Sequence, residues 1–172
     1  MVRKQILIAA EITIVIFVAL WFTGTAMQRL ALPLPTGDDI AARLAFAVQW
    51  LVIPGLTLLA GIALVSVRRF FSADAIDGTR TPASRSLEIN LRYNQNTVEQ
   101  IVLAAIARAG LALALPHERL SLIPAMAVLF GVGRVLFWLG YLAAPWARAI
   151  GYGFSFYPSV VALLWLGWRA LG

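Results

Sequence analysis

The stretch LRYNQNTVEQIVLAAI (residues 91–106) passes from a dense polar run into an uninterrupted apolar run within a few positions. Its first ten residues carry an arginine, a glutamate and four amide side chains, and its last six residues are all aliphatic. Polar groups at the start of an apolar membrane helix are costly unless they face other helices, a water-filled crevice or a ligand. The stretch therefore predicts a membrane helix with polar side chains that turn away from lipid.

The rest of the chain has the composition of a polytopic membrane protein. Of its 172 residues, 61% are hydrophobic and 13% are charged, and the mean hydropathy is +0.84. A helix needs about 20 mostly apolar residues to cross the hydrocarbon core. Five stretches meet or approach this length: residues 5–27, 44–67, 97–115, 120–143 and 150–171. Because backbone in contact with lipid must satisfy its own hydrogen bonds, we predict an all-α transmembrane bundle.

Cysteine and histidine usage limits the chemistry that the chain can perform. There is no cysteine, so no disulfide, thiolate nucleophile or thiolate metal site can form. The single histidine, His117, lies in a short turn, and no metal site is expected. The net charge of +6 is interpreted as a sign of membrane orientation and anionic headgroups rather than of nucleic-acid binding.

Positive charges near the ends of the apolar stretches predict the orientation in the membrane. With the N-terminus inside, eight lysines and arginines lie inside and four lie outside, so the N-terminus and residues 68–96 are expected in the cytoplasm. The first stretch is either a cleaved signal peptide or a retained helix. Retention is favoured because Glu11 interrupts the apolar run and because the run continues past Trp21.

Three polar clusters are expected at the cytoplasmic ends of the helices. In the first cluster, Arg92, Asn96 and Glu99 follow the spacing i, i+4, i+7 and share one face of a helix. A simpler explanation remains open for part of it, in which Asn94 or Asn96 caps the helix and Glu99 occupies its first turn.

The second cluster lies inside an apolar stretch, where Tyr141 follows Arg134 by seven residues on the same helix face. An arginine within the membrane needs a counter-charge or a polar cavity, and Glu99 is the best candidate partner for Arg134. Arg108 is another arginine inside an apolar stretch, and the sequence indicates no partner for it.

The third cluster lies at the start of the last apolar stretch, where Arg148 and Tyr152 are spaced i, i+4. Guanidinium groups recognise carboxylates through paired hydrogen bonds, and tyrosines add a polar group to an apolar body. The three clusters together predict a pocket for an anionic, partly apolar ligand at the cytoplasmic edge of the bilayer.

These motifs resemble the MAPEG superfamily, the membrane-associated proteins in eicosanoid and glutathione metabolism. The pattern is R-x-x-x-N-x-x-E in one helix, G-R-x-x-x-x-x-x-Y in the next and an arginine at the start of the last, and the resemblance covers residues 44–171. It implies a four-helix bundle that forms homotrimers and binds glutathione between subunits near the cytoplasmic face. Residues 44–172 would then be the MAPEG-like domain, and residues 1–43 an extra N-terminal helix with an outer loop.

The resemblance also implies a reaction and a role for each position. Arg148 would be the catalytic residue that stabilises the glutathione thiolate, because a neighbouring guanidinium lowers a thiol pKa. Glu99 would pair with Arg134 or with the glutathione amine. The positions expected to bind glutathione are Arg92, Asn96, Glu99, Arg134, Tyr141 and Tyr152. The expected reaction is the detoxifying transfer of glutathione, or a peroxidase reaction, on a lipophilic substrate that arrives from the bilayer.

A second function stays open on the basis of three departures from the glutathione-transferring members. Gln95 stands where these members often have a basic residue, and Phe137 stands where several have a histidine. The run NQN at residues 94–96 is similar to the lipoxygenase-activating protein, which binds lipid without glutathione chemistry. These departures favour a lipid-binding or scaffold protein of the same fold. In either case we expect an integral protein of a bacterial inner membrane or an equivalent membrane.

Overall fold

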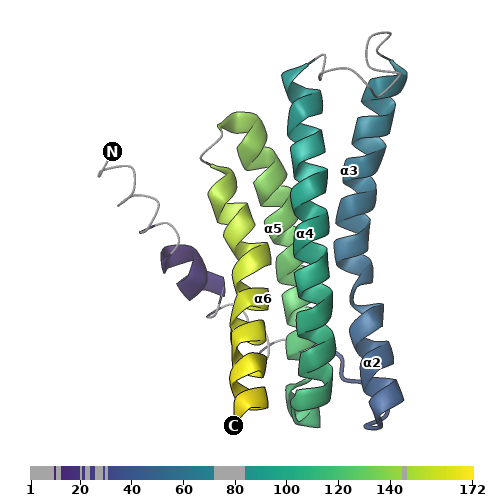
Figure 1. Ribbon diagram of the computed structural model, residues 1–172, viewed down its shortest axis with the longest axis vertical. Helices are drawn as coiled ribbons and strands as arrows, with labels where there is room; N and C mark the ends of the chain where they lie inside the picture. The colour runs from purple at the N-terminus through teal and green to yellow at the C-terminus, as the bar shows by residue number, and fades with distance from the viewer. Residues whose placement is uncertain are drawn as a thin grey trace.

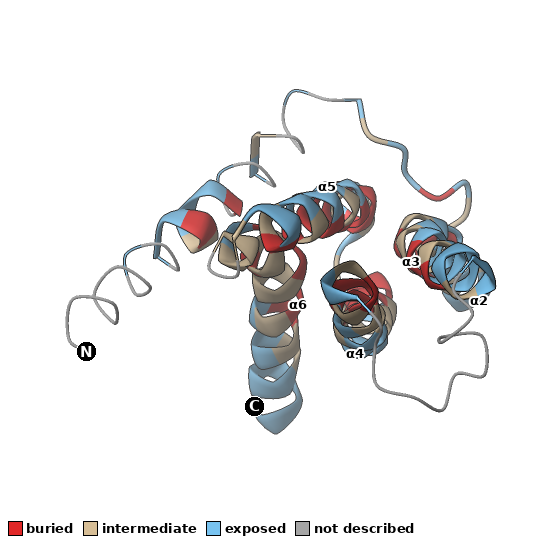
Figure 2. Ribbon diagram, turned by 90° about the horizontal axis from the view of Figure 1, so that it is seen from above, coloured by how far each residue is buried: buried red, intermediate tan, exposed pale blue. Residues whose placement is uncertain are grey.

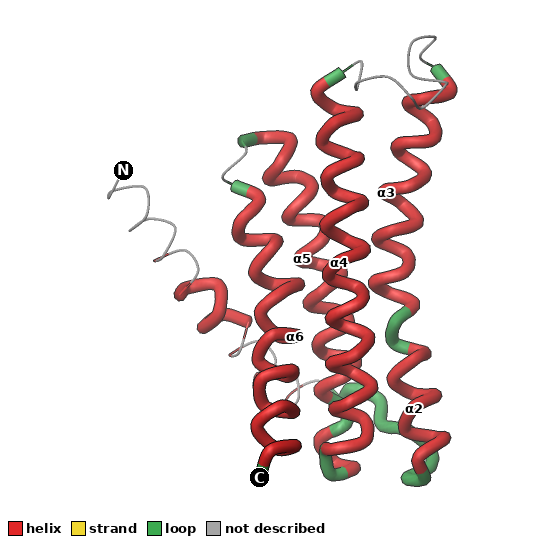
Figure 3. Tube along the Cα trace, in the orientation of Figure 1, coloured by secondary structure: helices red, strands yellow, loops and turns green. Residues whose placement is uncertain are grey.

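The computed structural model describes residues 10, 13–19, 21, 24–25, 29, 31–71, 84–144 and 147–172, and these residues contain helices and loops only (Figures 1 and 3). The helices follow in the order α2 (Ile40–Gln49), α3 (Val52–Phe70), α4 (Arg85–Ala114), the short 3-10 helix η1 (His117–Arg119), α5 (Leu122–Ala143) and α6 (Arg148–Leu171). Within this part of the chain, four helical spans are long and apolar enough to cross a membrane. The predicted all-α membrane class is confirmed.

The first of these spans is broken near its beginning. The sequence predicted one helix over residues 44–67, whereas α2 ends at Gln49 and α3 starts at Val52. Pro54 explains the break, because proline lacks an N–H and its ring collides with the carbonyl four residues earlier, that of Trp50. The two helices still follow one another along the side of the bundle (Figure 1).

Helix α4 begins earlier than predicted. It starts at Arg85 rather than at residue 97, and the Ser84 hydroxyl caps it by accepting a hydrogen bond from the Leu87 N–H at 3.3 Å. Asn94 and Asn96 therefore lie inside the helix, and the interpretation of either as a cap is wrong. At 1.5 Å per residue the 30 residues of α4 span about 45 Å, longer than a hydrocarbon core of about 30 Å. The polar first cluster is thus part of a helix that projects beyond the apolar layer.

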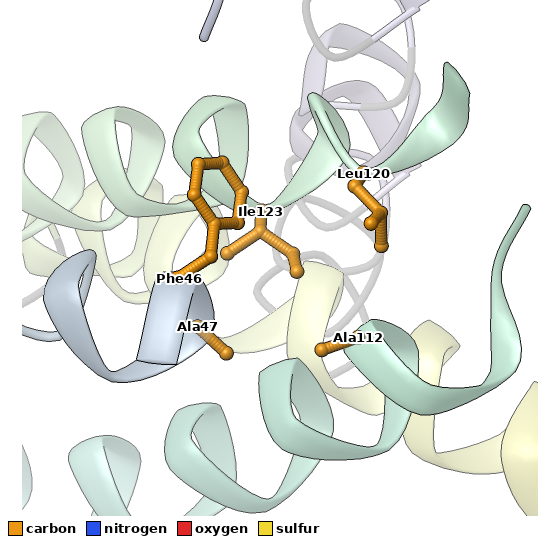
Figure 4. Packing of buried hydrophobic residues seen from close by; sticks show 5 residues of the cluster. All are labelled: Phe46, Ala47, Ala112, Leu120 and Ile123. Carbon is orange, nitrogen blue, oxygen red and sulfur yellow. The ribbon is translucent and has the colours of Figure 1, made fainter. Parts of the chain in front are cut away.

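The core lies between α4 and its neighbours (Figure 2). Buried positions on α4 recur every three or four residues, from Ile89 through Ala104 to Leu111, and form one seam along the helix. At the end where α4 finishes, Phe46 of α2 packs with Leu120 and other residues of one apolar cluster (Figure 4). Large apolar side chains such as those of α3 remain exposed on the outside, as expected of a surface that faces lipid.

Helices α5 and α6 pack most extensively against each other, with glycines at the contact. A Cβ atom added to Gly151 would lie 2.0 Å from the Phe137 nitrogen and 2.5 Å from the Gly133 carbonyl oxygen. A Cβ atom on Gly140 would lie 2.5 Å from the Ala147 carbonyl oxygen. Small residues allow membrane helices to approach at backbone distance. This approach holds the start of α6, and with it Arg148, against α5.

The C-terminal end of α4 is stabilised by arginines from two other helices. Arg43 of α2 donates to the carbonyls of Ala112 at 3.0 Å and Leu115 at 2.7 Å, and Arg169 of α6 donates to the Ala114 carbonyl at 2.6 Å. The last carbonyls of a helix lack intrahelical donors and carry partial negative charge, so cations stabilise this end.

Asp38 connects this end of the bundle to the turn between α4 and α5. Its carboxylate lies 2.5 Å from Arg43 and 2.9 Å from the His117 ring. The hydrogen bonds from His117 and Arg43 hold the pKa of Asp38 below its ordinary value of 3.8. A carboxyl group with a lowered folded-state pKa stabilises the fold above its unfolded pKa and loses this effect as the pH falls through the folded value.

We therefore expect Asp38→Asn to be less stable than the wild type at pH 6, and the difference to shrink as the pH falls below about 4, the ordinary pKa range of aspartate. Unfolding in detergent, followed by circular dichroism from pH 6 to pH 2, measures this convergence. Glu118→Gln is the matched control, because Glu118 is an exposed carboxylate in the same turn with no ion pair to the described residues. A constant difference between Asp38→Asn and the wild type would contradict the linkage.

The N-terminal part of the chain contributes a helical segment at residues 13–19. Val15 and Ala19 are buried, and a Cβ atom on Gly153 of α6 would lie 2.3 Å from the Val15 Cγ1 atom. The segment therefore packs on α6. Glu11, much of the predicted helix over residues 5–27, and the N-terminus itself lie outside the described residues.

Candidate functional site

Arg134 of α5 is fully buried between α5 and α4. It donates to the Asn96 side-chain oxygen at 2.8 Å and to the Tyr93 carbonyl at 3.4 Å. Its guanidinium lies over two aromatic rings, 4.2 Å from the Phe137 centroid and 4.7 Å from the Tyr93 centroid. The Nε atom has no partner. A buried guanidinium that has spare donor capacity is suited to accept an anionic ligand.

The prediction that Glu99 pairs with Arg134 is wrong. Glu99 is exposed and accepts a hydrogen bond from Gln95 at 2.9 Å, whereas the charged group of Arg134 lies on Asn96. At 3.6 residues per turn, Glu99 points about 120° away from Tyr93, which is on the buried face of α4. In the chain as described, Arg134 therefore has no carboxylate partner.

Tyr141 brings the other two predicted arginines together. Its hydroxyl accepts a hydrogen bond from Arg92 at 3.2 Å, and the Arg148 guanidinium lies 4.5 Å from the centre of its ring. Arg148 is the first residue of α6, where the helix dipole adds positive potential. Arg92 also forms an exposed ion pair with Glu88, at 2.5 Å. Two guanidinium groups therefore meet at one phenol near the start of α6.

An aromatic cluster connects the two groups of arginines. Tyr93, Phe137 and Tyr141 are buried together with Ile89, and Tyr152 packs against them. The rings of Phe137 and Tyr141 meet edge to face, with centroids 5.8 Å apart. The structure thus places six of the seven predicted site residues around one cluster: Arg92, Asn96, Arg134, Tyr141, Arg148 and Tyr152. The seventh, Glu99, lies on the exposed side of α4.

Two contacts at this site were missed from the sequence. The Trp138 indole donates to the Asn90 side chain at 2.9 Å, and the Tyr93 hydroxyl donates to the Thr57 carbonyl at 3.1 Å. They hold α5 and α3 against α4 and so fix the positions of Arg134 and Asn96. The position of Tyr93 beside Arg92 in the polar stretch was a signal that could have identified it. Asn90 and Trp138 are far from each other in the sequence, and nothing in the sequence indicated that they form a hydrogen bond.

Arg108 does not belong to this site. It is buried further along α4, donates to the Met126 carbonyl at 3.0 Å and lies 5.7 Å from the Phe130 ring centre. Its Nε and Nη1 atoms have no partner. The sequence indicated no partner for Arg108, and the structure shows that its partner is a backbone carbonyl of α5.

The site is strongly cationic. Three guanidinium groups surround the aromatic cluster, and the ion-paired acid beside them is the exposed Glu88. Among the described residues, no group of three histidine, aspartate or glutamate side chains could hold a metal ion. The arrangement can bind an anion with apolar parts, and it can stabilise negative charge at the start of α6.

The fold and the site define an integral membrane helix bundle with a cluster of arginines and aromatic side chains near one end. Residues 42–171 match the model of the MAPEG family, and the chain belongs to this family. The sequence-based resemblance is confirmed at this level.

Two curated relatives share part of the chain. Transmembrane protein 79 of Bos taurus is 33% identical over 81 residues, which cover 47% of this chain and 20% of that protein. Transmembrane protein 79 of Mus musculus is 32% identical over 81 residues, with 47% and 21% covered. The chain therefore spans about a fifth of the length of these relatives. No solved structure matches the chain.

Proposed function

We propose that this MAPEG-family membrane protein is a glutathione-dependent transferase or peroxidase that acts on lipophilic electrophiles. The observation that carries the proposal is Arg134, a fully buried guanidinium whose hydrogen bonds go to an amide and a backbone carbonyl rather than to an acid. A buried charge without a counter-charge is costly, and a carboxylate from a ligand would relieve this cost. Glutathione carries two carboxylates, an amine and a thiol.

The proposed binding roles follow the geometry of the site. Arg134 and Asn96 would hold one glutathione carboxylate, and Arg92 with Tyr141 would hold the other. Glu99, which is exposed, would pair with the glutathione amine. Tyr152 would pack near the sulfur. The apolar substrate would arrive from the bilayer between helices, which are apolar on their outer faces.

We propose a homotrimer because α4 exposes polar groups next to apolar ones. Arg92, Gln95 and Glu99 are exposed, and Val98 and Val102 beside them are exposed as well. Apolar side chains bordered by polar ones are typical of a subunit interface, and a neighbouring subunit would cover this face and complete the site. Native mass spectrometry that finds only monomers in mild detergent would contradict this assembly.

Isothermal titration of the purified full-length protein with glutathione tests the proposed function. We expect saturable binding in the millimolar range or tighter, and weaker binding of glutathione diethyl ester, which lacks both carboxylate charges. If glutathione does not bind at millimolar concentration, the transferase proposal fails.

Arg148→Leu tests the chemical step. The guanidinium and the start of α6 would both stabilise a thiolate placed there, so we expect the ultraviolet absorbance of bound thiolate to vanish. Turnover of a lipophilic electrophile should fall at least tenfold, and the pH dependence of the residual rate should shift upward. Arg148→Lys, which keeps the charge, should restore part of both signals.

Arg85→Leu is the matched control, because Arg85 also opens a long helix but contacts none of the site residues. It should leave turnover and the thiolate signal unchanged. If Arg148→Leu keeps both signals, Arg148 is a membrane anchor, and Arg92 or Arg134 activates the sulfur instead.

A second candidate function is a lipid-binding or scaffold role without catalysis. Phe137 favours it, because its apolar ring lies against Arg134 and contributes no hydrogen-bond donor or acceptor there. The names of the relatives indicate no glutathione chemistry. Binding of a lipophilic acid at the arginines without glutathione binding would establish this alternative.

We also propose which membrane holds the protein, how the protein is oriented in it and where the MAPEG-like domain begins. The end of α3 and the starts of α4 and α6 lie at one end of the bundle (Figure 1) and carry Arg69, Arg85 and Arg148. Arg43, Arg119 and Arg169 lie in or beside helix ends at the opposite end. We propose that the site end and the N-terminus face the cytoplasm of a bacterial inner membrane or an equivalent, and that the MAPEG-like domain begins near residue 44. A C-terminal reporter that works only in the cytoplasm should be silent.

A further inference from the structure

We propose a second binding site, for a single-chain lipophilic carboxylate such as a long-chain fatty acid, in a cavity at the opposite end of the bundle. The cavity has a volume of about 290 Å³ and lies between α4, α5, α6 and the N-terminal helical segment. Ile16 and Ala19 of that segment form one wall. Because the cavity is remote from Arg134 and Arg148, the proposal does not depend on glutathione binding.

The walls of the cavity are almost entirely apolar. Leu111 of α4, Met126 of α5 and Ala162 of α6 line it, and they belong to one buried apolar cluster. An aliphatic chain matches such walls because it leaves no polar group without a hydrogen-bond partner. The body of the expected ligand is therefore an aliphatic chain.

Arg119 gives the cavity its specificity for an anion. Arg119 lines the cavity, is exposed, and makes no hydrogen bond or ion pair through its side chain with any residue that the structure describes. Other arginines at this end are engaged, since Arg43 binds Asp38 and α4 carbonyls, and Arg169 binds the Ala114 carbonyl. The Arg119 guanidinium remains available to a carboxylate of the ligand.

Two further polar groups line the same cavity. Tyr157 and Trp165 lie on α6 eight residues apart, which corresponds to about 12 Å along the helix. Tryptophan and tyrosine concentrate at the boundary between lipid and water, where the ring is buried and the polar atom stays wet. Trp165 and Arg119 would hold the acid end of the chain at this boundary, and Tyr157 would contact it deeper in the bundle.

Size and charge select the occupant. Pockets for small molecules usually have volumes of about 300–1,000 Å³, so the cavity is at the lower limit and accommodates one chain rather than the two chains of a phospholipid. Among the described residues that line the cavity, Arg119 has the one guanidinium, which balances one negative charge. A monocarboxylate with one chain satisfies both conditions.

Quenching of tryptophan fluorescence by dibromostearate tests the proposal on the full-length protein in neutral detergent micelles. Bromine quenches tryptophan on contact, and Trp165 is in the cavity wall. Trp21 and Trp168 are exposed to the micelle and give a background of quenching. Above it, we expect a saturable component that Trp165→Phe removes and that oleate reverses at concentrations at least tenfold below those of methyl oleate, which lacks the charge. Dioleoyl phosphatidylglycerol should not compete.

Two variants separate the charge from the cavity. Arg119→Gln should weaken dibromostearate binding at least tenfold and abolish the preference for oleate over its ester, whereas Arg69→Gln, the same change at the other end, should alter neither. Val161→Trp should abolish binding by filling the cavity, and it should fold normally because Val161 is 45% exposed. Wild-type affinity in Arg119→Gln or Val161→Trp would overturn the site, as would competition by the phospholipid or the absence of saturable quenching.

Discussion

Gly151→Ala should destabilise the protein by about 3 kcal/mol, the upper part of the range for overpacked sites. The added Cβ atom would lie 2.0 Å from the Phe137 nitrogen and 2.5 Å from the Phe137 Cα atom. These are backbone atoms of α5, so no side-chain rotation can relieve the collision and the two helices must separate. Denaturation with sodium dodecyl sulfate, followed by circular dichroism, measures the loss.

The matched control for this prediction is Gly167→Ala on the same helix. A Cβ atom at Gly167 meets nothing within 4 Å, and alanine is favoured over glycine in a helix by about 1 kcal/mol. Gly167→Ala should therefore be neutral or slightly stabilising. Equal stability of the two variants would show that the close approach of α5 and α6 at Gly151 is not required.

Arg134→Leu should weaken glutathione binding by more than tenfold and leave the stability of the protein nearly unchanged. A hydrogen bond to a charged group contributes about 1.5–3 kcal/mol, and tenfold in affinity corresponds to about 1.4 kcal/mol. Stability should persist because an apolar side chain of similar size replaces a buried charge that has no counter-charge. Titration calorimetry measures the affinity, and detergent denaturation measures the stability.

This combination of results separates a binding residue from a structural one. A residue that only supports the fold would lower stability and affinity together. Arg134→Lys keeps the charge but loses the planar fork, and should bind glutathione with intermediate affinity. Arg69→Leu, which removes an arginine at the same end but outside the site, should bind like the wild type. Wild-type affinity in Arg134→Leu would refute the proposed site.

Most of the candidate site could be predicted from the sequence because its members follow helical spacing. Arg92 and Asn96 share a turn of α4, and Arg134 and Tyr141 share a face of α5, as the spacing indicated. Their assignment to glutathione stays a prediction. Whether Glu99 pairs with Arg134 could not be predicted from the sequence of either helix, because it depends on how α4 is rotated about its axis relative to α5.

The sequence by itself determined the class of the protein and its four described spans. Length and hydropathy of a segment are local properties, and the cost of lipid-exposed backbone leaves the helix as the solution for each apolar run. The spacing of arginine, asparagine and tyrosine along three helices is equally local, and it was sufficient to indicate the MAPEG family.

Only the tertiary structure decided which polar groups meet. It placed the Arg134 guanidinium on Phe137 and Asn96 rather than on an acid, and it brought Arg92 and Arg148 to one tyrosine. These contacts join residues of different helices, and the depth and rotation of each helix depend on the side chains of its neighbours. At Gly151, the absence of a side chain allows α6 to approach the backbone of α5. The sequence shows that the residue is a glycine, but the packing of the bundle shows which helix it contacts.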